Sequence, residues 1–226
     1  MEIIPAILPK SFKEIEEKVA QIVGTAPLVQ VDICDGKFVP TVTWPYWKAD
    51  ENFEAILREE RGMPEWEKIN YEFDLMIENP TEDDARKWLS AGAERIVLHH
   101  ESSKDLMPAI NILSGLVEIG IAINISTKLE EIKRYADKIQ FIQIMGIHKA
   151  GFQGQKFEPS TLDKVKEVRV IFPQMKIQID GGVTLENSEL LKHVGVDILV
   201  VGSAIFGDGH GDVENIIENL EEFKNI

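Results

Sequence analysis

The chain alternates between strand-like and helix-like apolar patterns eight times from its first residues to its last. Short, mainly apolar runs predict strands, and the segments between them have the apolar spacing of amphipathic helices. Capping boxes at Ser11–Glu14 and Thr127–Glu130 mark two helix starts, and the last helix is predicted over 213–223. Such alternation predicts a parallel sheet, because each return to the same sheet edge requires a crossover.

The number of units favours a (β/α)8 TIM barrel of the α/β class, which typically needs ~200–250 residues. The chain has 226 residues and no linker or low-complexity segment, so we predict a single barrel domain over 1–226. An open, doubly wound sheet is the alternative, but strands covered on both faces read as continuous apolar runs. Here Gln30 and Asp32 alternate with Val29, Val31 and Ile33, so one strand face is polar.

Other predicted strands repeat this pattern near their carboxyl ends. Barrel enzymes carry their active sites at that end, so we predict a shared polar centre there. Asp32 and Asp180 are candidate functional carboxylates, because a buried carboxylate is costly without a partner or a task. The alternative for Asp32 is a local turn cap. The polar positions that share this pattern are Gln30, Asp32, Glu72, Asp74, Asn124, Gln143, Gln178 and Asp180.

Glycine-rich loops after the last three predicted strands indicate an anion site. Glycine lets backbone amides approach an anion closely, and barrels commonly bind phosphate at the loops after strands seven and eight. The alternative is that these glycines only turn the chain. The predicted phosphate-binding residues are Gly151, Gly154, Gly181, Gly182, Gly202 and Ser203.

The composition limits partners and compartment. A net charge of −15 argues against a nucleic-acid partner, because phosphate backbones require a basic footprint. The single cysteine, Cys34, excludes an intrachain disulfide and suits a reducing compartment. No signal-peptide pattern is present, and the longest charge-free apolar stretch, 198–206, is too short to span a membrane. We therefore expect a cytoplasmic protein with neither nucleic-acid nor membrane partners.

Six stretches along the chain carry motifs that lie in register with one family: Val31–Pro40, Leu75–Pro80, His99–Glu101, Gly151–Phe157, Ile179–Val183 and Val201–Phe206. Together they resemble the ribulose-phosphate 3-epimerase family across nearly the whole chain. That family is a (β/α)8 barrel of the pentose phosphate pathway that interconverts D-ribulose 5-phosphate and D-xylulose 5-phosphate. The resemblance implies a sugar-phosphate substrate, acid/base aspartates at Asp32 and Asp180, and a homo-oligomer. It also places Cys34, Met76 and Met145 in the substrate pocket. His99 and Lys149 are further candidates for the pocket, although Lys149 departs from the family's pattern.

The metal site implied by the resemblance differs in this chain. The family holds a divalent metal with two histidines and two aspartates, and the histidine positions here are Gln30 and Asp74. The resulting all-oxygen set, Asp32, Asp74, Asp180 and the Gln30 carbonyl, favours Mg²⁺ or Mn²⁺ over Zn²⁺. The alternative is a metal-free site in which the Lys149 ammonium supplies the positive charge.

Three classes of function are compatible with these residues. The first is an epimerase that inverts C3 of a ketose 5-phosphate by two-base proton transfer through an enediolate. The second is a non-catalytic phosphosugar-binding barrel with a degenerate metal site. The third is a Schiff-base aldolase or lyase that uses Lys149. The presence of both Asp32 and Asp180 favours the first class.

Overall fold

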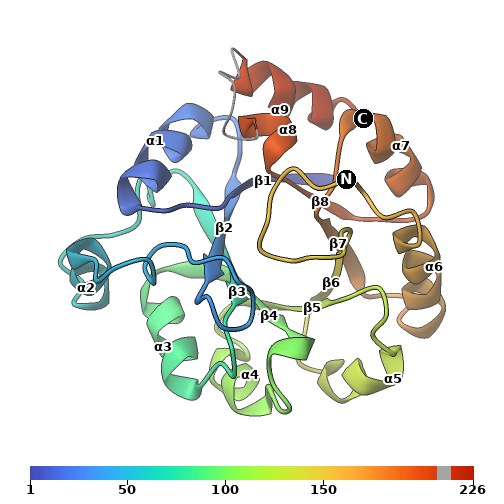
Figure 1. Cartoon of the computed structure of the whole chain (residues 1–226), viewed down its shortest axis with the longest axis horizontal. Coiled ribbons are helices and arrows are strands. Elements are labelled where there is room, and N and C mark those ends of the chain that lie inside the picture. Colours follow the sequence, from blue (N-terminus) through green and yellow to red (C-terminus); the bar gives the residue numbers. More distant parts are fainter. Residues whose placement is uncertain (208–214) are drawn as a thin grey trace.

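The computed structural model of the chain describes residues 1–207 and 215–226. Eight parallel strands close into a barrel in chain order, and β1 pairs with both β2 and β8. The helices form an outer ring around it (Figure 1). The predicted TIM barrel is confirmed, and the open-sheet alternative is wrong because the sheet has no free edge. The strands are β1 Glu2–Ile7, β2 Leu28–Cys34, β3 Asn70–Met76, β4 Ala93–His99, β5 Glu118–Ile123, β6 Phe141–Met145, β7 Lys176–Asp180 and β8 Ile198–Val201.

Each strand is followed by helical structure. No helix in the described part of the chain combines the length and apolarity that crossing a bilayer requires. The predicted start of the last helix at Val213 lies outside the described residues. The helices are α1 Phe12–Ile22, α2 Glu51–Leu57, α3 Glu82–Ser90, η1 His100–Ser102, α4 Met107–Leu113, α5 Leu129–Ile132, η2 Lys133–Tyr135, α6 Thr161–Ile171, α7 Leu185–His193, α8 Ser203–Phe206 and α9 Ile216–Lys224.

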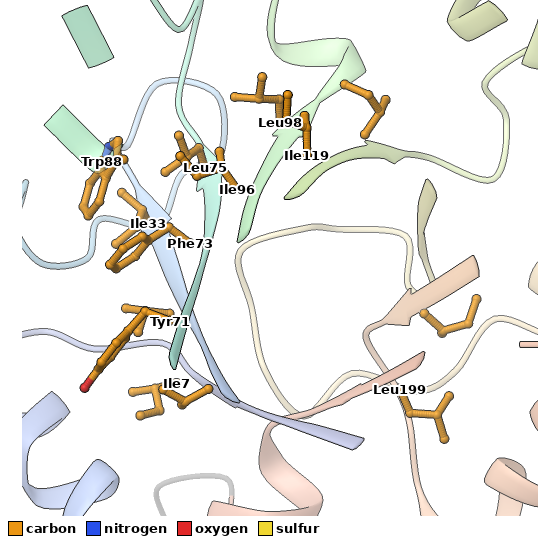
Figure 2. Close-up of a cluster of buried hydrophobic side chains, with 14 of the residues drawn as sticks. Ile7, Ile33, Tyr71, Phe73, Leu75, Trp88, Ile96, Leu98, Ile119 and Leu199 are labelled. Atoms are coloured by element: carbon orange, nitrogen blue, oxygen red, sulfur yellow. The ribbon is translucent and has the colours of Figure 1, made fainter. Parts of the chain in front are cut away.

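The main hydrophobic core lies between the barrel and its helices. Outward-facing strand residues such as Ile33 and Phe73 pack against helix residues such as Trp88 of α3 (Figure 2). The rings of Phe73 and Trp88 have centroids 4.8 Å apart. Each fully buried side chain of this kind contributes ~1.5–3 kcal/mol to folding. Because this layer supplies most of the apolar burial, several inward-facing strand positions can carry polar groups.

The inward faces carry the predicted polar residues in a fixed register. Asp32 of β2 pairs directly with Asp74 of β3, and Met145 of β6 pairs with Asp180 of β7. A small apolar cluster shares the interior of the barrel, with Ile4, Ala6, Leu28, Ile198 and Val200 as its members. The alternation predicted from β2 is therefore confirmed, and it points Asp32 into the barrel.

The two predicted helix caps have different outcomes. The Ser11 hydroxyl accepts from the Glu14 amide and caps α1, although the Glu14 carboxylate accepts from the Lys10 amide instead of closing the box. The capping box at Thr127 is wrong, because α5 begins at Leu129 without a side-chain cap. The Thr127 hydroxyl donates instead to Glu101. The Thr127 hydroxyl, which the local sequence predicted as a helix cap, therefore bonds to Glu101 of the preceding strand-helix unit instead.

Candidate active site

Three carboxylates meet at the C-terminal end of the barrel. Asp32, Asp74 and Asp180 each offer one oxygen, and these oxygens lie within 4.8 Å of one another. Asp74 is fully buried and Asp32 is 6% exposed. We call these three side chains the acidic centre. The centre arises because β2, β3 and β7 each carry an inward-facing aspartate at or near their C-terminal ends.

Two glutamine amides hold the acidic centre together. The Gln30 Nε2 donates to Asp32 Oδ1 at 2.8 Å and to Asp180 Oδ2 at 3.4 Å. The Gln143 Nε2 donates to Asp74 Oδ2 at 3.2 Å and to Asp180 Oδ2 at 3.5 Å. Hydrogen bonds to an ionised carboxylate favour its charged form. The two amides therefore reduce the repulsion within the centre without adding a positive charge.

A further amide fixes the orientation of Gln143. The Gln178 Nε2 donates to Gln143 Oε1 at 2.8 Å and to Glu72 Oε1 at 2.7 Å. It also reaches Gln30 Oε1 at 3.5 Å. The carbonyls of Gln30 and Gln143 thus face Gln178, and their NH2 groups face the carboxylates. Gln30 as a metal ligand through its carbonyl stays a prediction, because that oxygen points away from the acidic centre.

His99 contacts the acidic centre from β4. Its Nε2 lies 2.8 Å from Asp74 Oδ1, and both side chains are buried. Burial by itself disfavours the imidazolium, but the charge of Asp74 and its hydrogen bond outweigh that effect and raise the pKa of His99. Asp74 therefore favours the protonated form of His99. A direct contact between His99 and substrate stays a prediction.

The electrostatics of the centre follow from burial and crowding. Burial, followed by the charges of Asp180 and Asp74, raises the pKa of Asp32. Burial and then the charge of Asp74 raise the pKa of Asp180 to about 7. Three close carboxylates therefore hold a proton near neutral pH unless a cation enters. This excess of oxygen donors and negative charge fits a hard divalent cation such as Mg²⁺ or Mn²⁺.

A pocket opens above the acidic centre at the barrel mouth. Asp32 and Asp180 line it, so the predicted acid/base pair shares one cavity. All the predicted phosphate residues line it as well, from the loops after β6, β7 and β8. Gly182 has φ +70°, and a Cβ there would lie 2.6 Å from the Phe157 backbone. The full lining is Ala6, Asp32, Met76, Met145, Ile147, Gly151, Phe152, Gln153, Gly154, Asp180, Gly181, Gly182, Val183, Val200, Gly202 and Ser203.

Some predicted pocket residues lie elsewhere in the described structure. Cys34 is buried behind Met76, with its Sγ 3.9 Å from the Met76 Sδ. Lys149 is exposed on the loop after β6 and is not among the residues that line the pocket. The neighbouring His148 pairs with Glu158 at 2.7 Å.

Sequence reasoning missed the pocket role of Gln153. This residue lies between two of the predicted phosphate-binding glycines, yet its side chain was given no function. The sequence did contain a signal for this role, because a glutamine in a glycine-rich loop has few neighbouring side chains that could face a ligand in its place.

Comparison with known proteins agrees with this architecture. The model of the ribulose-phosphate 3 epimerase family matches residues 2–206. A ribulose-phosphate 3-epimerase of Aquifex aeolicus is 31% identical over 209 residues, covering 90% of this chain and 88% of the relative. One from Bacillus subtilis is 28% identical over 214 residues, covering 92% and 93%.

Solved structures support the fold. A 3-hexulose-6-phosphate synthase superposes with a TM-score of 0.72 at 14% identity, covering 99% of both chains. KGPDC from Streptococcus mutans, in complex with D-R5P, gives a TM-score of 0.70 at 14% identity, covering 99% of this chain and 97% of that one. At these identities the likeness concerns the barrel alone.

Proposed function

Since the chain belongs to the ribulose-phosphate 3-epimerase family, we propose that it is an isomerase that inverts C3 of a ketose 5-phosphate. The substrate pair is D-ribulose 5-phosphate and D-xylulose 5-phosphate, in keeping with the names of its relatives. The observation that carries the proposal is the pocket in which Asp32 and Asp180 stand beside a glycine cradle. Carboxylates for proton transfer and backbone amides for a phosphate are the two requirements of this reaction.

The two carboxylates divide the proton transfers. One ionised aspartate takes the C3 proton, and the electron pair of that bond moves to form the enediolate with its charge on the C2 oxygen. The other, protonated aspartate returns a proton to the opposite face of C3, so no net oxidation occurs. The raised pKa of Asp180, about 7, suits this role because a group near the working pH can both accept and donate.

The acidic centre would hold a divalent metal through Asp32, Asp74 and Asp180. Gln30 would be a fourth ligand only with its side-chain amide turned over, so that the carbonyl replaces the NH2 group that now faces the carboxylates. When bound, such a metal supplies positive charge that stabilises the enediolate oxygen. Mg²⁺ or Mn²⁺ suits the all-oxygen donors better than Zn²⁺. His99 and Gln143 orient Asp74 by binding one carboxylate oxygen each, at 2.8 Å and 3.2 Å.

The two other function classes receive less support. A Schiff-base enzyme requires a lysine at the substrate, and Lys149 is exposed on the loop outside the pocket lining. A non-catalytic barrel would have no need of two neighbouring carboxylates with raised pKa values in its ligand pocket.

The test is an assay of ribulose 5-phosphate epimerisation after EDTA treatment, with Mg²⁺, Mn²⁺, Zn²⁺ and Fe²⁺ added back separately. We expect activity to fall on chelation and to return best with Mg²⁺ or Mn²⁺. Lys149→Met should keep wild-type activity. A protein that converts no ribulose 5-phosphate with any of the metals would contradict the proposal.

A further inference from the structure

Among the described residues, no cationic side chain lines the pocket that contains the phosphate cradle, although Lys156 lines a neighbouring groove that shares Gly154, Gly182 and Ser203 with it. Among the described residues that line the pocket, none is lysine, arginine or histidine, whereas Asp32 and Asp180 both line it. The chain as a whole has a net charge of −15. A phosphate dianion in this pocket therefore meets negative charge both locally and at long range, so the N–H and O–H dipoles of the lining carry much of its binding. Side-chain donors in the cradle consequently matter more than they would beside an arginine.

Gln153 carries the only side-chain N–H groups among the described residues that line the pocket. Its Nε2 donates to the Ala6 carbonyl at 3.3 Å, which joins the loop after β6 to β1. The same Nε2 lies 2.7 Å from the point that a Cβ on Gly202 would occupy. The amide thus lies over the cradle glycine of the loop after β8. In Figure 1 the loop that follows β6, coloured yellow to orange, crosses the barrel mouth.

The backbone on both sides of Gln153 is held in place. A Cβ on Gly151 would lie 2.8 Å from the Val39 Cγ2, so the loop packs closely on the loop after β2. On the other side, Phe157 packs against Gly182. The Gln155 amide donates to the Phe152 carbonyl at 3.0 Å. Because these contacts position the loop before a ligand arrives, little ordering entropy opposes a bond from the Gln153 amide.

We propose that Gln153 determines specificity for a phosphorylated substrate by donating its side-chain amide to the phosphate group. One N–H of the amide bonds to Ala6, and the second is available to an anion seated beside Gly202. The assignment of that anion as the phosphate of a sugar substrate rests on the proposed function. A hydrogen bond to a charged acceptor corresponds to about 10- to 100-fold in affinity.

Two substitutions of Gln153 distinguish the effect of its N–H donor from the effect of its side-chain size. Gln153→Met keeps the length but has no N–H, and Gln153→Glu keeps the shape but places negative charge at the cradle. Isothermal titration with inorganic phosphate should show at least about tenfold weaker binding for Gln153→Met and a larger loss for Gln153→Glu. The KM for ribulose 5-phosphate should rise by similar factors, with kcat nearly unchanged.

Lys166→Gln is the matched charge control. It changes the net charge by the same amount as Gln153→Glu, but Lys166 is exposed on α6 and pairs with Asp163. This variant should bind phosphate as the wild type does. Wild-type phosphate affinity in both Gln153 variants would overturn the inference, and so would a fall in kcat with KM unchanged. A wild-type protein that binds no inorganic phosphate would overturn it as well.

The two measurements keep the inference apart from the proposed function. Weaker phosphate binding by the Gln153 variants, in a protein that does not epimerise ribulose 5-phosphate, would support the phosphate contact and refute the activity. Active variants with wild-type phosphate affinity and KM would support the activity and refute the contact.

Discussion

Replacing Asp74 by asparagine should weaken divalent-metal binding at the acidic centre by about two orders of magnitude. The three carboxylate oxygens lie within 4.8 Å of one another. At an effective dielectric constant of ~20, two carboxylate charges separated by this distance repel each other by ~3.5 kcal/mol. A bound divalent metal attracts the Asp74 carboxylate with twice a unit charge, whereas His99, 2.8 Å from Asp74, offsets part of the carboxylate's charge when it is protonated. A net loss of ~3 kcal/mol corresponds to about 10²-fold in affinity.

The assay is titration of metal-free protein with Mn²⁺, followed by electron paramagnetic resonance or calorimetry. The histidine NMR signals give a second readout, because the pKa of His99 should fall when the carboxylate that raises it is removed. Asp83→Asn, on the exposed surface of α3, makes the same chemical change outside the centre and should leave both readouts unchanged. Wild-type Mn²⁺ affinity in Asp74→Asn would refute its assignment as a ligand.

Three further predictions concern the acid/base pair, the cradle and the barrel interior. Asp32→Asn or Asp180→Asn should lower turnover by at least ~10²-fold in a folded protein, and normal turnover in Asp180→Asn would remove it from the mechanism. Gly202→Ala should displace the Gln153 amide, 2.7 Å from the new Cβ, and raise the KM for ribulose 5-phosphate, whereas an unchanged KM would place the anion elsewhere. Burial raises the pKa of Glu72 to about 8, so the folded state favours the protonated, neutral carboxyl of this residue. The free energy of unfolding should therefore decline as pH rises from ~4.5 through about 8, and Glu72→Gln should flatten this decline in urea unfolding.

The barrel and its polar interior were predictable because they follow from periodicity. Strict alternation of strands and helices indicated a parallel sheet, and period-two polarity placed Asp32 on the inward face. Both depend only on residues near one another in the chain. The glycine loops could be assigned to one end for the same reason, since parallel strands all end at one face.

The contacts that orient the site residues depend on strand register and on how the loops pack, and neither can be read from a local sequence pattern. The pairing of His99 with Asp74 crosses β3 and β4, whose register shifts at Tyr71/Glu72. The reach of Gln153 to Ala6 spans 147 positions and depends on how the loop after β6 packs. Thr127 shows the same effect in a helix cap, where Glu101 displaced the local partner.

The direct test of the two-base account is epimerisation of ribulose 5-phosphate in D2O, with the products analysed by NMR before equilibrium is reached. If Asp32 and Asp180 act from opposite faces, the new xylulose 5-phosphate should carry one solvent deuterium at C3. The remaining ribulose 5-phosphate should carry little. Xylulose 5-phosphate that retains the original C3 hydrogen, or that gains deuterium at C1 instead, would contradict the account.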